Sequence, residues 1–240
     1  MSGKRVVLSL KGLPSLCLTA RSGRVTVTGE ERPDVVFESG VSSARDVEQD
    51  ATGRIAVTSA RWGSAALEVR CPTGTDVVVG TASGRVELRG RLGEVRVTTL
   101  SGRIEVDQAE ALDLRSVSGS IAVVQCERRC RVQTKSGRAT VGIAEDADLS
   151  TVSGRVRLDS SSGSIQVRTA SGSVEVGTEG GGDVDVQTIS GSVRVEVPEG
   201  VRPAAELRSR AGRCRCDCPE GRDCRIVVSS MSGKIEVVSC

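Results

Sequence analysis

The chain has 240 residues and contains no histidine, no tyrosine, one phenylalanine and one tryptophan. This composition removes the commonest general base and metal ligand, excludes a Ser-His-Asp triad, and leaves too few rings to stack single-stranded nucleic acid. The formal net charge of +2, from 33 basic and 31 acidic residues, gives no field that would attract nucleic acid or an anionic membrane.

The first 75 residues carry strand patterns at irregular spacing. Residues 18–27, 34–38, 54–58 and 65–70 alternate or cluster β-branched side chains as short strands do, while the polar residues 40–53 indicate a loop. We expect residues 1–75 to form an atypical portion that caps an array of repeats. No segment approaches the ~18 apolar residues of a membrane span, and the apolar start is too short for a signal peptide. The sequence therefore predicts a cytoplasmic protein without a transmembrane segment.

From residue 76 onward one pattern recurs nine times, with steps of 17 to 21 residues between its central glycines. A hydroxyl residue stands three positions before each glycine, and apolar residues occupy the second and fourth positions after it in most repeats. The central glycines are Gly84, Gly102, Gly119, Gly137, Gly154, Gly172, Gly191, Gly212 and Gly233. Glycine fits a sharp corner because such corners often need a positive φ.

This periodicity predicts an all-β fold, a single-chain parallel β-solenoid of short 17–21-residue coils in which residues 76–240 form one continuous domain with the N-terminal cap. Stacked coils would place each hydroxyl over the next at the strand spacing of about 4.8 Å. The rival topology is an antiparallel meander with Ser-Gly as the hairpin turn, which explains the alternation but not the hydroxyls in register.

The Thr-x-Ser-Gly-x-Val-x-Val repeats, the entry at residues 67–79 and the Val-Pro-Glu-Gly turn at residues 197–200 resemble the bacterial putative-adhesin β-repeat family, also described as the toastrack domain. The resemblance is clear over residues 65–240. It implies a non-catalytic β-solenoid found in bacterial envelope-stress and surface contexts, and it transfers no catalytic residues.

Four cysteines near the C-terminus are candidate metal ligands: Cys214, Cys216, Cys218 and Cys224. The first three share one face of a strand and, with the fourth, could form a tetrahedral thiolate site. They also occupy positions that are valine one repeat earlier, at Val193, Val195 and Val197, and free cysteine commonly fills cores. We therefore expect core packing, and we keep a metal-binding or redox-responsive protein as the alternative function.

Two further patterns suggest binding or chemistry. Basic residues directly after corner glycines would form a broken stripe, namely Arg85, Arg103, Arg138, Arg155, Arg213 and Lys234, and acidic residues two positions on would neutralise much of it. Asp183 and Asp185 share one face of a strand, as a polysaccharide-active β-helix enzyme could require. Short coils leave little room for the loops that build a cleft, so this enzyme is the second alternative.

The sequence thus predicts a scaffold or interaction module without enzymatic activity or cofactor. We expect it to bind a protein or a polymer at a flat face. It could also bind a second copy of the chain through a solenoid end, because an open strand edge is a template for pairing.

Overall fold

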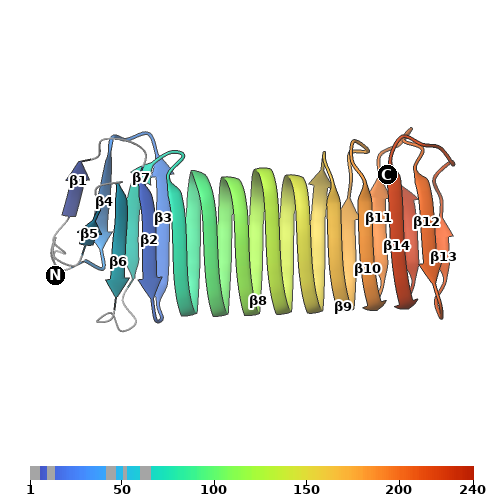
Figure 1. Ribbon diagram of the computed structural model, residues 1–240, viewed down its shortest axis with the longest axis horizontal. Coiled ribbons are helices and arrows are strands. Elements are labelled where there is room, and N and C mark those ends of the chain that lie inside the picture. Colours follow the sequence, from blue (N-terminus) through green and yellow to red (C-terminus); the bar gives the residue numbers. More distant parts are fainter. Residues whose placement is uncertain (1–5, 10–13, 42–46, 51–52, 60–65) are drawn as a thin grey trace. The chain divides into compact units, whose positions relative to one another are not determined.

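The computed structural model describes residues 6–9, 14–41, 47–50, 53–59 and 66–240. These residues form an all-β protein with one mostly parallel, 15-stranded sheet (Figure 1). The chain divides into two compact units, residues 1–123 and 124–240. The strands are β1 (Val6–Ser9), β2 (Ser15–Ala20), β3 (Arg24–Glu30), β4 (Asp34–Ser39), β5 (Val47–Gln49), β6 (Arg54–Ser59), β7 (Leu67–Pro72), β8 (Asp76–Ser161), β9 (Ile165–Gly177), β10 (Val184–Ser190), β11 (Val193–Val197), β12 (Ala204–Ser209), β13 (Cys214–Cys216), β14 (Arg225–Ser232) and β15 (Ile235–Ser239).

The strands expected in the first 75 residues are present, and one further strand lies in a region predicted as a loop. The predicted loop at residues 40–53 contains the short strand β5, which pairs antiparallel with β6; residues 42–46 and 51–52 of that loop lie outside the described part. Residue 65 of the expected strand 65–70 also lies outside it. The division into a cap of residues 1–75 and a regular array stays a prediction.

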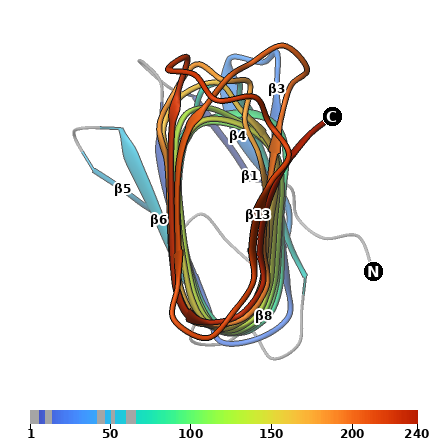
Figure 2. The same cartoon turned by 90° about the vertical axis from the view of Figure 1, so that its right-hand side faces the viewer.

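Neighbouring repeats pair in parallel, which rules out the meander of hairpins. Within unit 2, Ala147 to Leu158 of β8 run in register with Ile165 to Val176 of β9. Figure 2 shows the strands of this unit, coloured yellow to red, as two facing layers joined at their narrow ends. Inward side chains on both layers are buried, as at Val186 and Val195, which are 0% exposed.

The Ser-Gly corners stack on one another. Eight of the nine central glycines have a positive φ, between 135° and 156°, and Gly212 is the exception. At Gly172 φ is +137°, and a Cβ atom there would collide with the carbonyl oxygen of Gly154 in the neighbouring repeat. Glycine is thus required both by the backbone conformation and by the closeness of the next corner.

In five of the nine repeats the recurring hydroxyl closes the corner with a local hydrogen bond. The hydroxyl of Thr169 donates to the carbonyl oxygen of Ser171 at 3.2 Å, and Thr151 donates to Ser153 at 3.3 Å in the same way. The same bond occurs at Thr81, Ser116 and Thr134. All of these residues except Thr81 are buried, so in them the bond satisfies a polar atom that water reaches poorly.

In unit 1 the order of the strands in space differs from their order in the sequence. β2 pairs in parallel with β6 on one side and with β8 on the other, and β3 lies between β7 and β8 in the same way. Strands β2 and β3 are therefore inserted between β6 and β7 on one side and the start of β8 on the other. On the outer side β4 pairs antiparallel with β7 and β1 pairs antiparallel with β4.

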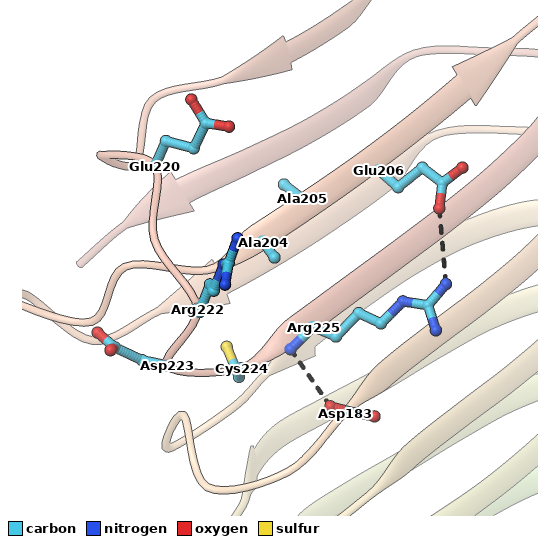
Figure 3. Close-up of a pocket in the computed structure, with 9 residues that line it drawn as sticks. All are labelled: Asp183, Ala204, Ala205, Glu206, Glu220, Arg222, Asp223, Cys224 and Arg225. Atoms are coloured by element: carbon cyan, nitrogen blue, oxygen red, sulfur yellow. Dashed lines mark hydrogen bonds and ion pairs between the residues drawn. The ribbon is translucent and has the colours of Figure 1, made fainter.

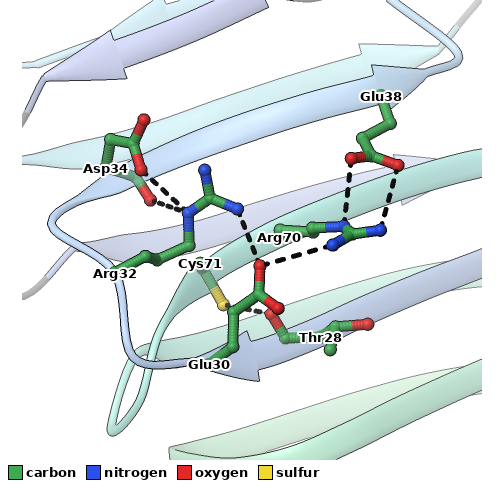
Figure 4. Close-up of polar contacts among 7 residues, drawn as sticks. All are labelled: Thr28, Glu30, Arg32, Asp34, Glu38, Arg70 and Cys71. Carbon is green, nitrogen blue, oxygen red and sulfur yellow. Dashed lines mark hydrogen bonds and ion pairs between the residues drawn. The ribbon is translucent and has the colours of Figure 1, made fainter.

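A network of ion pairs joins β3, β4 and β7 in unit 1 (Figure 4). The guanidinium of Arg32 contacts the carboxylates of Glu30 and Asp34, each at 2.8 Å, and Arg70 contacts Glu38 at 3.0 Å. The hydrogen bond to Asp34 contributes most to a raised pKa of Arg32. Beneath these groups lies the buried thiol of Cys71, which donates a hydrogen bond to the carbonyl oxygen of Thr28 at 3.6 Å.

At the C-terminal end of unit 2 the order of the strands in space again differs from their order in the sequence. β14 pairs in parallel with β10 and with β12, and β15 pairs with β11 and with β13. The last repeat of the sequence is therefore inserted before the repeat of Gly212. The repeat of Gly212 therefore forms the end of the unit, although the repeat of Gly233 follows it in the sequence.

Candidate functional site

The structure places the four candidate cysteines at the end of unit 2 but does not bury them as valines. Cys214 and Cys216 are exposed, Cys218 is half-buried and Cys224 is buried. The predicted register is correct, because Cys214 and Cys216 stand beside the fully buried Ile235 and Val237. The predicted burial is wrong for these two thiols, since no described strand covers their repeat on its outer side.

The same cysteines do not form a metal centre in the part of the chain that is described. Among these residues no group of three or more His, Cys, Asp or Glu side chains is placed to hold a metal ion. Burial, aided by the neighbouring thiol of Cys216, raises the pKa of Cys218 to about 11, and burial also raises the pKa of Cys224. Because the thiolate is the metal ligand and the nucleophile, these shifts favour the unreactive thiol.

The basic stripe follows the corners as expected, and much of it is paired. In unit 1, Arg85 lies 3.5 Å from Glu87, and Arg103 lies 3.4 Å from Glu105. In unit 2, Arg155 donates a hydrogen bond to the hydroxyl of Ser173 at 3.3 Å, and Lys234 forms an ion pair with Glu236. Arg138 and Arg213 are exposed on the same side of their corners. Within each unit the basic residues therefore belong to a mixed-charge surface, which attracts a polyanion only weakly.

An acidic hollow of about 450 Å³ lies near the start of β12 (Figure 3). It contains Asp183, one of the two aspartates considered for polysaccharide hydrolysis, but it is not lined by Asp185. The carboxylate of Asp183 accepts a hydrogen bond from the backbone N–H of Arg225 at 3.3 Å. Asp185 instead accepts hydrogen bonds from the side chain of Gln187 at 3.3 and 3.4 Å. Both carboxylates thus stabilise local structure, and they do not face each other across one hollow.

Exposed apolar side chains form a feature that the sequence analysis did not identify. Among the described residues, eight large hydrophobic side chains are exposed, and five of them stand two positions before a corner glycine: Leu100, Val117, Val152, Ile189 and Met231. The repeat pattern described from the sequence does not specify this position. Its apolar character in most repeats was the available signal.

In unit 2 these side chains lie side by side. The pairing of β8, β9, β10 and β14 aligns Val152, Ala170, Ile189 and Met231, which we call the apolar row. The exposed fractions are 56% for Val152, 56% for Ile189 and 52% for Met231, and Ala170 is half-buried. Adjacent members are one strand spacing apart, about 4.8 Å.

Polar and basic groups surround the apolar row. A hollow of about 440 Å³ is lined by Ala170 and Ile189 of the row together with Arg168, Gln187, Ser229 and nearby hydroxyls. Two buried hydroxyls here, Thr188 and Ser230, have no hydrogen-bond partner, as is also true of Thr99 in unit 1. Thr151 and Thr169 in the adjacent repeats each donate one hydrogen bond. Lys135 and Arg210 occupy the same position in the repeats that flank the row, and both are exposed.

The described structure contains no helix with the length and hydrophobicity needed to cross a membrane. Its parallel repeats and apolar row define an all-β repeat protein with an exposed apolar face. The Toastrack DUF4097 family model matches residues 7–238. The chain therefore belongs to this family, which confirms the resemblance seen in its Ser-Gly repeats.

Solved structures of bacterial proteins are similar to the chain over nearly its whole length. A putative adhesin from Parabacteroides distasonis ATCC 8503 is 12% identical, with 98% of each chain covered and a TM-score of 0.38. A putative adhesin from Bacteroides fragilis NCTC 9343 is 10% identical, with 98% of this chain and 97% of that chain covered and a TM-score of 0.42. One from Parabacteroides merdae ATCC 43184 is 10% identical, with 98% and 95% covered and a TM-score of 0.42. No curated protein matches the chain.

Proposed function

We propose that the chain is a β-solenoid that acts as a non-catalytic interaction module and binds a protein partner through the apolar row. The parallel register of neighbouring repeats and the stacked corners within each unit support the solenoid. The partner would be met in the cytoplasm, the location that the sequence predicts.

The observation that carries this proposal is the alignment of exposed apolar side chains on adjacent strands. Val152, Ile189 and Met231 are each more than half exposed, although outward positions elsewhere in unit 2 are occupied mainly by charged and polar residues. Single exposed apolar residues are common on protein surfaces, but contiguous ones mark interaction sites. Because each member lies beside the next, a partner would cover the whole row at once.

The surroundings of the row define the chemistry of the partner. Lys135 and Arg210 flank it, and Arg168 lines the adjoining hollow. A partner segment with apolar side chains at its centre and carboxylates at its ends would match this arrangement, since complementary charge fixes the register of binding. The unpaired hydroxyls of Thr188 and Ser230 lie beneath the same segment.

The groups that could support catalysis are engaged in structural contacts. Asp183 and Asp185 accept hydrogen bonds from neighbouring residues, and burial raises the pKa of Cys218 and Cys224 so that both remain thiols at neutral pH. The hydroxyls of the corner repeats have no imidazole to activate them, because the chain contains no histidine. These features support a binding role without a chemical step.

Site-specific photo-crosslinking tests the proposal. A photoreactive residue at Ile189 should capture a defined partner in the producing cell, and a second substitution, Met231→Lys, should reduce that capture at least severalfold. The control places the same photoreactive residue at Ser192, which is exposed beyond the corner on the other layer. Equal capture at both positions, or capture at Ile189 that Met231→Lys leaves unchanged, would refute the apolar row as the binding surface.

A further inference from the structure

The C-terminal end of unit 2 presents two free strand edges. In the described structure β12 pairs only with β14, and β13 pairs only with β15. The connection after β13 meets this edge just before β12, where the N–H of Gly221 donates to the carbonyl oxygen of Pro203 at 3.3 Å and the N–H of Asp223 donates to that of Arg202 at 3.0 Å. A strand edge with unpaired backbone groups is a template for another strand.

The hydrogen-bonding direction of these edges follows from the bonds already made. The N–H of Ala204 donates to the carbonyl oxygen of Cys224 at 2.8 Å, and the N–H of Asp217 donates to that of Val237 at 2.9 Å. The backbone groups of Ala204 and Asp217 therefore point toward the adjacent inner repeat and away from the free edge. Successive residues of a strand direct their backbone groups to opposite sides. The backbone groups of Leu207 on β12 and of Cys216 on β13 therefore point to the free edge.

The core is also open at this end. Ala205 and Leu207 are in register with Ile226 and Val228, and Cys214 and Cys216 are in register with Ile235 and Val237. The four residues of the inner repeat are 0% exposed. Their counterparts at the end are exposed, except for Leu207, which is half-buried. Another layer of the same construction would complete the burial.

We propose that this end binds the same end of a second copy of the chain, related by a two-fold axis that passes through Leu207 and Cys216. The corner lies between Ala211 and Gly212, so that Leu207 and Cys216 are equally distant from it along their strands. One axis can therefore pair β12 with β12 and β13 with β13, both antiparallel. In both pairs the central residues exchange two hydrogen bonds across the interface.

Charge complementarity selects this arrangement. Pairing centred on Leu207 places Glu206 opposite Arg208 of the second copy, and pairing centred on Cys216 places Arg215 opposite Asp217 of the second copy. These residues sit in the closely spaced pairs of an antiparallel ladder, where opposite charges stabilise and like charges destabilise.

The other two-fold arrangement of the same ends pairs β12 with β13 of the second copy. It would place Glu206 opposite Asp217, and Arg208 opposite Arg215, so that every outward contact is repulsive. The sequence of the two edge strands thus favours one orientation and opposes the other. The closed two-fold contact uses both free edges of each copy and leaves none for further growth at this end.

This self-association goes beyond the proposed partner binding and uses a different surface from the apolar row. Loss of one interaction therefore leaves the other to be measured. A dimer would also present two apolar rows to partners, which raises apparent affinity for any partner with two matching segments.

Charge reversal at Glu206 tests the proposal. Sedimentation velocity over a concentration series under reducing conditions measures how strongly the chain dimerises. The wild type should show a monomer–dimer equilibrium. Glu206→Arg creates two Arg–Arg contacts in place of two ion pairs and should weaken the dimer roughly tenfold or more. The double variant Glu206→Arg/Arg208→Glu restores opposite charges and should return affinity close to that of the wild type. It also shows that loss in the single variant is not a folding defect.

Glu196→Arg is the matched control. Glu196 forms an ion pair with Arg194 of its own strand at 2.9 Å, as Glu206 does with Arg208, but its strand β11 is flanked by strands on both sides. It should leave dimerisation unchanged. A wild type that is monomeric at every concentration, or a dimer that Glu206→Arg does not weaken, overturns the proposal. Open-ended growth with concentration would show head-to-tail stacking and overturn it as well.

A disulfide trap reports the register. In a Cys214→Ser/Cys218→Ser background, the two Cys216 residues of the dimer face each other with Cα atoms about 5.5 Å apart, within disulfide range. Diamide should then join them, since two thiols lose their hydrogens as the diazene is reduced to the hydrazine. Cys216→Ser in the same background should abolish the linked dimer. A linked dimer that forms through Cys240 alone would contradict the register.

Discussion

Replacing the corner glycine Gly172 by alanine should destabilise unit 2 far more than the same change at Gly200. Both glycines have a positive φ, +137° and +88°. At Gly200 a Cβ atom would meet nothing within 4 Å, so only backbone strain of about 1–2 kcal/mol is expected. At Gly172 the Cβ atom would collide with the carbonyl oxygen of Gly154. Displacement of a packed backbone adds about 1–3 kcal/mol, for a total of about 2–5 kcal/mol.

Urea denaturation followed by far-ultraviolet circular dichroism measures both variants against the wild type. Because repeats contact mainly their neighbours, the Gly172→Ala transition should broaden or split as the affected repeats unfold first. Hydrogen exchange should locate the loss of protection at the corners of Gly154, Gly172 and Gly191. Equal loss of stability in the two variants would show that the stacking of corners contributes nothing beyond the φ requirement, and would refute the reasoning.

Three further outcomes follow from the buried positions. Thr169→Val removes the hydroxyl bonded to Ser171 and should lower the free energy of unfolding by about 1 kcal/mol. Thr188→Val removes a buried hydroxyl without a partner and should be neutral or stabilising. Chemical denaturation of the two variants compares these effects. Val195→Ala should cost about 2 kcal/mol because Val195 is fully buried, whereas Cys216→Ala at low protein concentration should stay within about 0.5 kcal/mol. Burial raises the pKa of Cys71 from 9.0 to about 11, so its contribution is complete below pH 9 and is lost as the pH rises toward 11. Stability should fall by about 2 kcal/mol over that range and Cys71→Ala should flatten the fall, as denaturation midpoints at several pH values will show.

The repeat pattern was sufficient to predict the corners and the parallel ladders. Gly172 and its equivalents show the positive φ that the Ser-Gly spacing indicated, and the hydroxyls recur in register. The reason for the hydroxyl was not predicted. Its bond to the carbonyl oxygen two residues later, as from Thr169 to Ser171, depends on the conformation of the corner, which a residue pattern does not specify.

The candidate site was predicted less well, because exposure depends on what covers a strand. The alignment with Val193 and Val195 gave the correct register for Cys214 and Cys216 but implied a covering repeat that is not there. The apolar row was missed for a different reason. Ile189 and Met231 occupy a position that the repeat pattern left unspecified, and their exposure is seen only in the structure.

The difference between spatial and sequence order at the ends of the units is possible because the repeats are so similar. Every repeat offers the same alternation and the same corner, so β10 can pair equally well with β12 or with β14, and the ladder alone does not choose between them. The connections decide: residues 198–203 must pass over one repeat, and residues 217–224 must return across it. As a result, β14 and β15 are paired on both edges, and β12 and β13 form the edge of the unit. The outermost repeat is connected to the rest of the unit by residues 198–203 before it and by residues 217–224 after it. These two connections anchor the open edge that we propose as an interface.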